Sequence, residues 1–375
     1  MIRVLTTDNY AMKFNVSRNS QHVLVWKRFV PWRKLWRPLD ALATWIPEPK
    51  GYEMIHSFNR IPYGSKPWVV TFESKLPRTL GAGAWLQRLL RLRLLHPSCK
   101  RVIAMSEYAR SQFIEQNSDW PRIAEVLKKL EVIHPSVPVR ASRPKRFNPS
   151  DPLKLIFVGN DFARKGGIVS LRVAQKAKKR GLKIQLHIIS ALNYGSRSYC
   201  DHTQGRRYET DLKLLSLENV VYHGKQPNQT VLSRFDESHL NLLPTLDDTY
   251  GYSVLEGFAG GTPAITSDVC ALPEFVKPAQ NGVLLKLASR PGLRWPHIAE
   301  PDRSSQHFWD ALDHAYESLA EQTVDRIEML MTNPEQYEEL SAGALDSVMR
   351  NHNVEMASER LDRLYLESFS PDGAS

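Results

Sequence analysis

Residues 247–274 read Asp-Asp-Thr-Tyr-Gly-Tyr-Ser-Val-Leu-Glu-Gly-Phe-Ala-Gly-Gly-Thr-Pro-Ala-Ile-Thr-Ser-Asp-Val-Cys-Ala-Leu-Pro-Glu. They follow an apolar run that ends at Asn241-Leu-Leu-Pro244. Gly251 permits a backbone turn or a close approach, and Ser253 stands where a helix N-cap would stand. The order strand, loop and helix predicts that the loop lies at the carboxyl end of a strand. In an open α/β sheet, that end is where ligands bind.

Two acids, Asp248 and Glu256, flank this glycine turn. Free N–H groups in the first turn of a helix favour an anionic group, and a carboxylate one turn into the helix can accept hydrogen bonds from sugar hydroxyls. A simpler interpretation is that Ser253-x-x-Glu256 is a capping box, in which the glutamate only bonds back to the N-cap amide. For this tetrapeptide alone, the capping box would be favoured.

The wider pattern favours a ligand site. It comprises Pro244-Thr245, Gly251, Gly261-Thr262-Pro263, Pro273-Glu274 and Asn281-Gly282. With the two acids, it resembles the nucleotide-sugar site of retaining glycosyltransferases of the GT-B type (glycosyltransferase family four, or glycosyl transferases group one). The family has an acid, seven intervening residues and a glutamate.

The resemblance assigns roles to this segment. It implies that Glu256 binds the ribose diol of the donor and that Asp248 is a catalytic residue beside the transferred sugar. The donor-binding residues implied around them are Tyr250, Gly251, Tyr252 and Ser253. Asp248 replaces the usual glutamate and is one methylene shorter, so the identity of the donor sugar stays open.

A second motif lies upstream. The apolar run from Leu153 to Gly159 is followed by a loop, residues 160–167, and by helical residues 168–180. This resembles the family's first strand and basic loop, in which an arginine after the glycine and a lysine five positions on neutralise the donor's diphosphate. Lys165 holds the lysine position, Asn160 occupies the arginine position, and Arg164 is expected to supply the missing charge. The alternative is a solvated Arg-Lys pair in a surface turn.

Residues 1–140 are predicted to form a first Rossmann-like domain that binds the acceptor. Its expected strands are 2–6, 22–26, 53–57, 68–72, 101–104 and 131–134, and its expected helices are 82–96, 107–116 and 121–129. Residues 138–152 have the composition of a linker, and residues 153–351 are predicted as the Rossmann-like domain that binds the donor. The resemblance implies that the two domains face each other across a cleft and that a last helix, 354–369, crosses back to the first.

Glu73 is the second catalytic candidate. It follows Val69-Val-Thr-Phe72, where the family tends to have a histidine. By that analogy it would orient the donor sugar or the acceptor hydroxyl. The alternative, a solvated glutamate balanced by Lys75 and Arg78, is equally favoured.

Positive charge is concentrated in the first domain. Residues 1–150 contain 26 Lys and Arg against 10 Asp and Glu, although the net charge of all 375 residues is only +10. No acid occurs from Asn9 to Leu39 or from Ser74 to Ser106, and the first stretch interleaves basic residues with Trp26, Trp32 and Trp36. Such a surface suits an anionic membrane. Single-stranded nucleic acid is a less favoured partner, and a solvated basic face whose tryptophans belong to the core is the third possibility.

The predicted function is transfer of a sugar from a nucleoside diphosphate donor to a saccharide or lipid-linked acceptor, with retention implied by the family, in polysaccharide biosynthesis. No Asp-x-Asp triplet occurs, so neither a metal nor another cofactor is expected. The enzyme is predicted to be cytoplasmic, because its three cysteines form no CxxC pair, no apolar stretch is long enough to span a membrane, and the first segment is typical of a strand. The basic, aromatic first domain favours a peripheral position on the inner face of the membrane. The alternatives are an inactive homologue that binds nucleotide or glycan and a nucleic-acid-binding protein.

Overall fold

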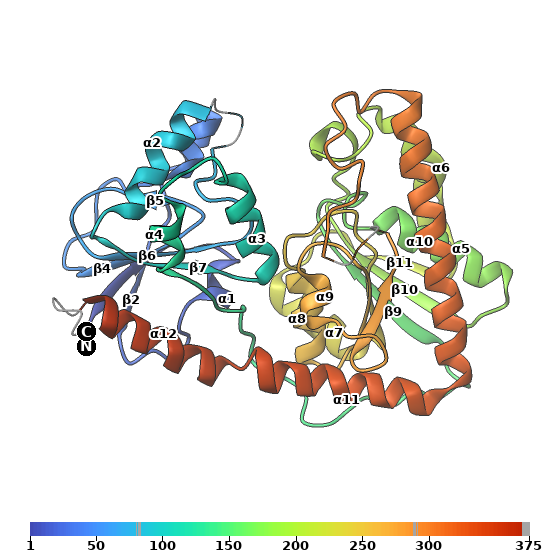
Figure 1. Ribbon diagram of the computed structural model, residues 1–375. Helices are drawn as coiled ribbons and strands as arrows, with labels where there is room; N and C mark the ends of the chain where they lie inside the picture. The colour runs from blue at the N-terminus through green and yellow to red at the C-terminus, as the bar shows by residue number, and fades with distance from the viewer. Residues whose placement is uncertain (80, 82–83, 288–289, 291, 370–375) are drawn as a thin grey trace. The chain divides into compact units, whose positions relative to one another are not determined.

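The computed structural model describes residues 1–79, 81, 84–287, 290 and 292–369. The chain divides into two compact units, each built on a parallel sheet. The first unit comprises residues 1–137 and the C-terminal stretch from Asn351, and the second comprises Pro138–Arg350. In Figure 1 the first unit carries the blue-to-green elements and the red helix α12.

The sheet of the first unit has the order β2-β1-β4-β6-β7-β8, with all neighbouring strands parallel. Their bounds are β1 Arg3–Thr6, β2 Val23–Trp26, β4 Met54–Phe58, β6 Trp68–Phe72, β7 Cys99–Ala104 and β8 Leu130–Val132. Each expected strand is confirmed to within two residues at either end. The central strands β4 and β6 are buried along their whole length, as strands covered on both faces should be.

Helices surround this sheet. They are α1 Met12–Asn15, α2 Ala84–Leu95, α3 Glu107–Gln116, α4 Ile123–Leu127 and α12 Val354–Phe369. Two 3-10 turns, η1 Trp32–Lys34 and η2 Arg37–Ala41, precede a short parallel pair, β3 Leu42–Ala43 with β5 Ile61–Pro62. Ser106 caps α3 by accepting a hydrogen bond from the Ala109 amide at 2.9 Å, as a strand-to-helix serine should.

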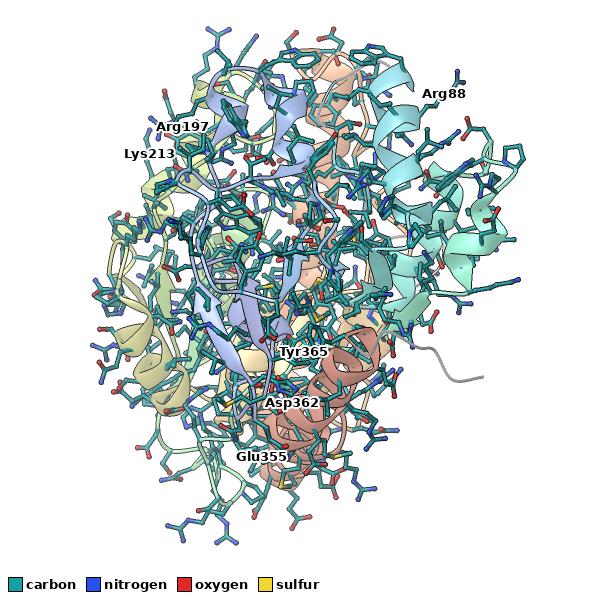
Figure 2. All side chains as sticks on the ribbon, turned by 90° about the vertical axis from the view of Figure 1, so that its left-hand side faces the viewer. Arg88, Arg197, Lys213, Glu355, Asp362 and Tyr365 are labelled. Atoms are coloured by element: carbon teal, nitrogen blue, oxygen red, sulfur yellow. The ribbon has the colours of Figure 1, made fainter. Side chains whose placement is uncertain are left out.

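Helix α12 packs onto the first unit, which confirms that the last helix returns to it. Leu361, Leu364 and Tyr365 join a core with apolar residues of the strands. The ring nitrogens of His56, in β4, lie 2.7 Å from the Tyr365 hydroxyl and 2.8 Å from Thr71 Oγ1. Tyr365 and Asp362 are labelled on this helix in Figure 2.

The sheet of the second unit has the order β11-β10-β9-β12-β13-β14, again parallel throughout. Its strands are β9 Leu153–Val158, β10 Ile184–Ile189, β11 Val220–Tyr222, β12 Leu240–Leu243, β13 Ala264–Ser267 and β14 Gly282–Leu285. Its helices are α5 Gly167–Lys179, α6 Glu209–Leu212, α7 Asn228–Glu237, α8 Tyr252–Ala259, α9 Leu272–Phe275, α10 Gln306–Thr332 and α11 Pro334–Asn351.

Alternating side chains of β9 serve two cores. Leu155 and Phe157 join the cluster built with α5 and α10, whereas Ile156 joins a smaller cluster with Val231 and Phe235 of α7. The period of two along a strand sends neighbouring residues to opposite faces, so helices cover the sheet on both sides. Helices α5 and α10 are neighbours in Figure 1.

The segment predicted as a linker, 138–152, is instead part of the second unit. The amides of Arg140 and Ala141 both donate to the Ala259 carbonyl, at 2.7 and 3.1 Å. The Lys145 ammonium donates to the Phe235 and Ser238 carbonyls, each at 2.7 Å, and Phe147 is buried in the main core. Its prolines and charged residues gave the segment the composition of a linker, but its polar groups form hydrogen bonds that fix it to the second unit.

Candidate functional site

Strands β9 and β12 lie side by side at the point where the chain reverses its direction across the second sheet. From β9 the chain runs outward through β10 and β11, and it then returns to place β12 on the other side of β9. Such a switch point opens a crevice beyond the carboxyl ends of the two strands, where ligands of α/β proteins bind. The residues expected to bind the donor follow these two strands.

The loop after β9 is shaped by two glycines. A Cβ on Gly159 would lie 2.8 Å from Lys165 Cδ, so the lysine stem crosses directly over this residue. Gly166 has φ 90° and is the N-cap of α5, where a Cβ would lie 2.3 Å from the Pro244 carbonyl oxygen. Only glycine accepts this backbone and this contact. Asn160, between them, is exposed.

The structure brings Lys165 and Asp248 together, although they are far apart in the sequence. The Lys165 ammonium donates to Asp248 Oδ2 at 2.9 Å, and their side chains are 24% and 11% exposed. Burial alone would raise the pKa of Asp248, but the charges of Lys165 and Arg164 and the hydrogen bond from Lys165 lower it below its ordinary value. Asp248 is therefore an ionised carboxylate beside a cation at the switch point.

Arg164 has a different environment from the one that the sequence suggested. Its guanidinium donates to the Asp247 carbonyl and to Asp161 Oδ2, the latter at 2.6 Å, and its side chain is only 11% exposed. Asp247 is in turn held by the Tyr199 hydroxyl, by Arg294 Nε at 3.1 Å and by the Cys270 thiol at 3.3 Å. Arg164 thus joins the loop after β9 to the loop after β12.

Helix α8 begins two residues before the position expected. Gly251, with φ 90°, is the N-cap, and it makes no side-chain capping bond, so Ser253 lies inside the first turn and the capping-box interpretation is wrong. Asp248 Oδ1 accepts a hydrogen bond from the Gly251 amide at 3.2 Å. The Ser253 hydroxyl is 92% buried with its residue, and the described residues give it no hydrogen-bond partner. A buried hydroxyl in this position can donate to an anionic ligand at the helix start.

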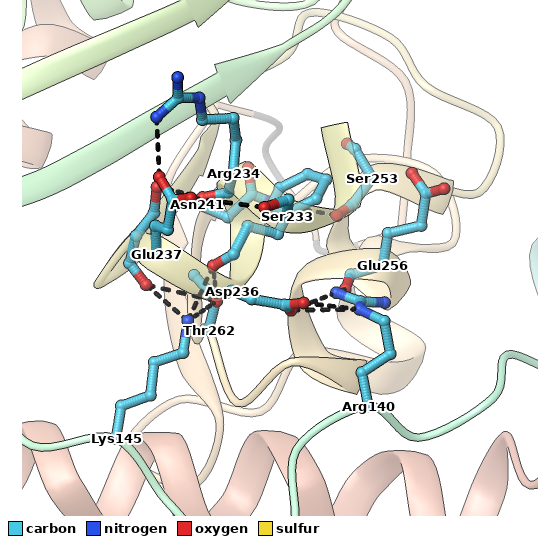
Figure 3. A network of polar contacts seen from close by, with 12 residues as sticks. Arg140, Lys145, Ser233, Arg234, Asp236, Glu237, Asn241, Ser253, Glu256 and Thr262 are labelled. Carbon is cyan, nitrogen blue, oxygen red and sulfur yellow. Dashed lines mark hydrogen bonds and ion pairs between the residues drawn. The ribbon is translucent and has the colours of Figure 1, made fainter. Parts of the chain in front are cut away.

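Glu256 is held from two sides. Asn228, the first residue of α7, donates from Nδ2 to Glu256 Oε1 at 3.0 Å, and Arg140 Nη2 donates to the Glu256 carbonyl at 2.7 Å. Arg140 also pairs with Asp236 at 2.9 Å. Figure 3 shows the Glu256 carboxylate pointing away from the Arg140 guanidinium, which lies beside the last turn of α8. A cation at the C-terminal end of a helix is favourable, so Arg140 helps to fix α8.

The tyrosines of the motif differ in exposure. Tyr250 is fully buried and stacks on Phe275, with ring centroids 5.0 Å apart, and its burial raises its pKa. Tyr252 is partly exposed, at 5.8 Å from the Tyr250 ring. Tyr250 therefore supports the loop from inside, whereas the ring of Tyr252 remains reachable by a ligand.

Glu73, the catalytic candidate of the first unit, directly follows β6. Its carboxylate accepts a hydrogen bond from Arg78 Nη1 at 3.0 Å, and its amide donates to Asn59 Oδ1 at 3.1 Å. The side chain is 20% exposed. The pairing with Arg78 agrees with the alternative weighed from the sequence, and a role in catalysis remains a prediction.

Three residues of the site carried no signal in the sequence. They are Asp247, Asn228 and Arg140. Each acts through a contact with a residue that lies between 28 and 116 positions away in the sequence. Local patterns do not predict such contacts. Within the described ranges no three His, Cys, Asp or Glu side chains gather as a candidate metal site, and none of the helices described there is long and apolar enough to cross a membrane.

Comparisons with known proteins match most of the second unit by sequence and the whole chain by fold. Residues 139–290 match the family model "Glycosyl transferases group 1". An uncharacterized 41.2 kDa protein in the cps region of Klebsiella pneumoniae is 23% identical over 160 residues, which are 43% of this chain and 43% of that relative. The match thus spans less than half of the relative's own length.

Two solved structures share the whole fold. HepE from Anabaena, in complex with UDP-glucose, has a TM-score of 0.63 at 11% identity over 98% of this chain and 100% of its own. A sucrose-phosphate synthase from Thermosynechococcus elongatus has a TM-score of 0.62 at 15% identity over 99% of this chain and 100% of its own. Residues 139–290 of the second unit are thus similar to glycosyl transferases group 1, and the chain as a whole has the two-domain GT-B fold.

Proposed function

We propose that this protein is a glycosyltransferase that moves a sugar from a nucleoside diphosphate donor to a saccharide or lipid-linked acceptor in the cytosol. The observation that carries the proposal is the pairing of Lys165 with Asp248 at the switch point between β9 and β12, next to the start of helix α8, which carries Glu256. The match to group 1 over this region and the UDP-glucose bound by HepE support it.

Each group has a role in donor binding. The Lys165 ammonium pairs with the donor diphosphate, and the N-terminal turns of α5 and α8 supply amide donors for the same charge. Glu256 accepts hydrogen bonds from the ribose hydroxyls, and Ser253 donates its free hydroxyl to the diphosphate. Asp248, ionised beside Lys165, contacts the transferred sugar.

Transfer needs charge stabilisation on the departing diphosphate. Lys165 and the two helix starts provide it without a metal, because donors fixed before the reaction stabilise developing charge at little further cost. We propose a metal-independent reaction on this ground and on the lack of an Asp-x-Asp triplet in the sequence. Retention of the anomeric configuration is proposed from the family resemblance.

One observation favours a second candidate, a donor-binding homologue without turnover. Asn160 replaces the family's arginine, and Arg164 is occupied by Asp161 and the Asp247 carbonyl. Of the two cations expected at the diphosphate, only Lys165 remains accessible.

A donor assay separates the two candidates. Nucleoside diphosphates and their sugars are first screened by thermal shift, since a ligand that binds only the folded state raises its stability. The best donor is then incubated with the protein and a panel of saccharide and lipid-linked acceptors, with and without EDTA, and release of nucleoside diphosphate is measured. We expect stabilisation and release in both conditions. Stabilisation without release would favour the inactive homologue, and release restored only by added manganese or magnesium would contradict the metal-independent reaction.

A further inference from the structure

Helix α2 of the first unit exposes an apolar stripe. Trp85, Leu89 and Leu92 are 60%, 54% and 51% exposed, and their spacing places them on one side of the helix. Leu86, Leu90 and Leu94, on the other side, are buried. A surface helix normally turns polar residues outward, whereas this helix is apolar on both sides.

A second exposed group belongs to the same part of the unit. Leu35 and Trp36, between η1 and η2, are 77% and 45% exposed. The end of η2 is joined to α2, because Ala41 packs in one cluster with Leu86 and Leu90. Two segments that lie about fifty residues apart in the sequence are thus held together, each with large apolar side chains in solvent.

The charges around these side chains are almost all positive. Arg33, Lys34 and Arg37 are exposed beside Leu35 and Trp36. Arg88 lies within the stripe of α2 with its side chain 65% exposed, and Figure 2 shows it extending away from the protein. Neither segment contains an exposed acid, since Asp40 is buried and paired with Arg60.

One carboxylate beside the stripe, that of Asp119, belongs to the segment between α3 and α4. Asp119 lies 2.7 Å from Arg91 and 3.7 Å from Arg88. Its hydrogen bond is to Arg91, whose own side chain is only 8% exposed. Arg88 is therefore held loosely and remains able to contact a partner.

We propose that α2 and the η1–η2 segment form a surface that docks on an anionic lipid bilayer. Trp85, Leu89 and Leu92 enter the headgroup layer, where apolar side chains gain burial and tryptophan is favoured. Arg88 and the basic residues beside Trp36 contact lipid phosphates. Burial of the apolar stripe gives a contribution to binding that salt does not screen. The attraction between the basic side chains and the lipid phosphates gives a contribution that salt does screen.

A bilayer fits better than a second copy of the chain. Two copies that met through this surface would bring Arg33, Lys34, Arg37 and Arg88 against their equivalents, and Asp119, the acid beside Arg88, is already hydrogen-bonded to Arg91. Like charges facing each other oppose association. An anionic bilayer offers an apolar layer and negative charge together.

The test uses the full chain and vesicles of phosphatidylglycerol mixed with phosphatidylcholine, with pure phosphatidylcholine as reference. Flotation is measured at low and high salt for the wild type, for a triple variant Trp85→Ser, Leu89→Ser, Leu92→Ser, and for Arg88→Gln. The matched control is Met356→Ser with Leu366→Ser on α12, where both residues are exposed and neighbour Glu355 and Glu367.

We expect the wild type to float with anionic vesicles and to keep a residual bound fraction at high salt. The triple variant should lower the partition coefficient by at least about tenfold at both salt concentrations, because it removes three apolar side chains from the bilayer. Arg88→Gln should weaken binding only at low salt, and the α12 control should bind like the wild type. Far-UV circular dichroism checks that each variant is folded.

Three results would overturn the proposal. They are absence of wild-type binding to anionic vesicles, wild-type binding by the folded triple variant, and a wild-type dimer in solution that the triple variant loses. The last result would assign the surface to a second copy. None of these outcomes bears on donor binding, which is measured in the second unit.

Discussion

Replacement of two adjacent basic residues, Arg164 and Lys165, is expected to affect different properties of the protein, stability in the first case and ligand binding in the second. Lys165 is 24% exposed and faces Asp248 at the switch point, whereas Arg164 is 11% exposed and joins two loops. Methionine keeps much of the length of both side chains and removes the charge. The prediction is that Lys165→Met mainly weakens ligand binding and that Arg164→Met mainly weakens folding.

The magnitudes follow from these contacts. A charge-assisted hydrogen bond contributes about 1.5–3 kcal/mol, so Lys165→Met should raise the dissociation constant for nucleoside diphosphate by about 10- to 150-fold. Arg164→Met leaves the Asp247 carbonyl without this donor and Asp161 without its cation, which should cost about 2–3 kcal/mol of unfolding free energy, since Asp161 is partly exposed. For a unit of this size, the melting temperature should then fall by roughly 5–10 °C.

Calorimetric titration and thermal unfolding of the same preparations separate the two effects. The control is Lys178→Met on α5, a lysine whose side chain is 48% exposed and pairs with Glu218, which should change neither quantity appreciably. The reasoning would be refuted if Arg164→Met bound nucleotide weakly at wild-type stability while Lys165→Met bound it normally. In that case Arg164 would be the diphosphate ligand after all.

Three further predictions concern Glu256, Arg140 and His56. Glu256→Gln should weaken binding of a nucleoside diphosphate more than binding of its 2′,3′-dideoxy analogue, because only the former offers ribose hydroxyls; equal losses in calorimetry would deny the ribose contact. Arg140→Ala should lower donor affinity several-fold by releasing the last turn of α8. The control Arg146→Ala lies on the same segment and removes only an exposed ion pair with Glu338, so it should leave the affinity unchanged. Equal effects of the two variants in the same titration would exclude a positioning role for Arg140. Burial lowers the pKa of His56 from 6.5 to about 3. Below pH 6.5 the unfolded chain therefore binds a proton at this residue that the folded chain does not bind. The free energy of unfolding should fall as the pH drops below 6.5. Urea unfolding between pH 6.5 and 4 should show a shallower decline for His56→Asn than for the wild type, and identical slopes would contradict this cause.

The sequence predicted the strands and the switch-point loops well because local signals specify them. The strands of the first unit are mainly apolar runs followed within two residues by a polar residue, and the terminal helix has one apolar face. Gly251 was picked out as a place for a backbone turn or a close approach, and a Cβ there would lie 2.6 Å from Leu272 Cδ2.

The errors arose where distant contacts decide the structure. Ser253 is a residue type that favours the N-cap position, but Gly251, with its positive φ, is the N-cap, and the helix begins two residues before the expected position. Residues 138–152 resemble a linker until the contacts of Arg140 and Lys145 with α7 and α8 are seen. The burial of Arg164 depends on Asp247, more than eighty residues away, and no local pattern carries that information.

The central claim is that a nucleotide-sugar binds beyond the carboxyl ends of β9 and β12. A crystal structure of the protein with a nucleoside diphosphate tests it most directly. The account predicts that the diphosphate lies within hydrogen-bonding distance of Lys165 Nζ and the first turn of α8, with the ribose beside Glu256. A ligand bound elsewhere on the chain, with Lys165 still paired only to Asp248, would contradict it.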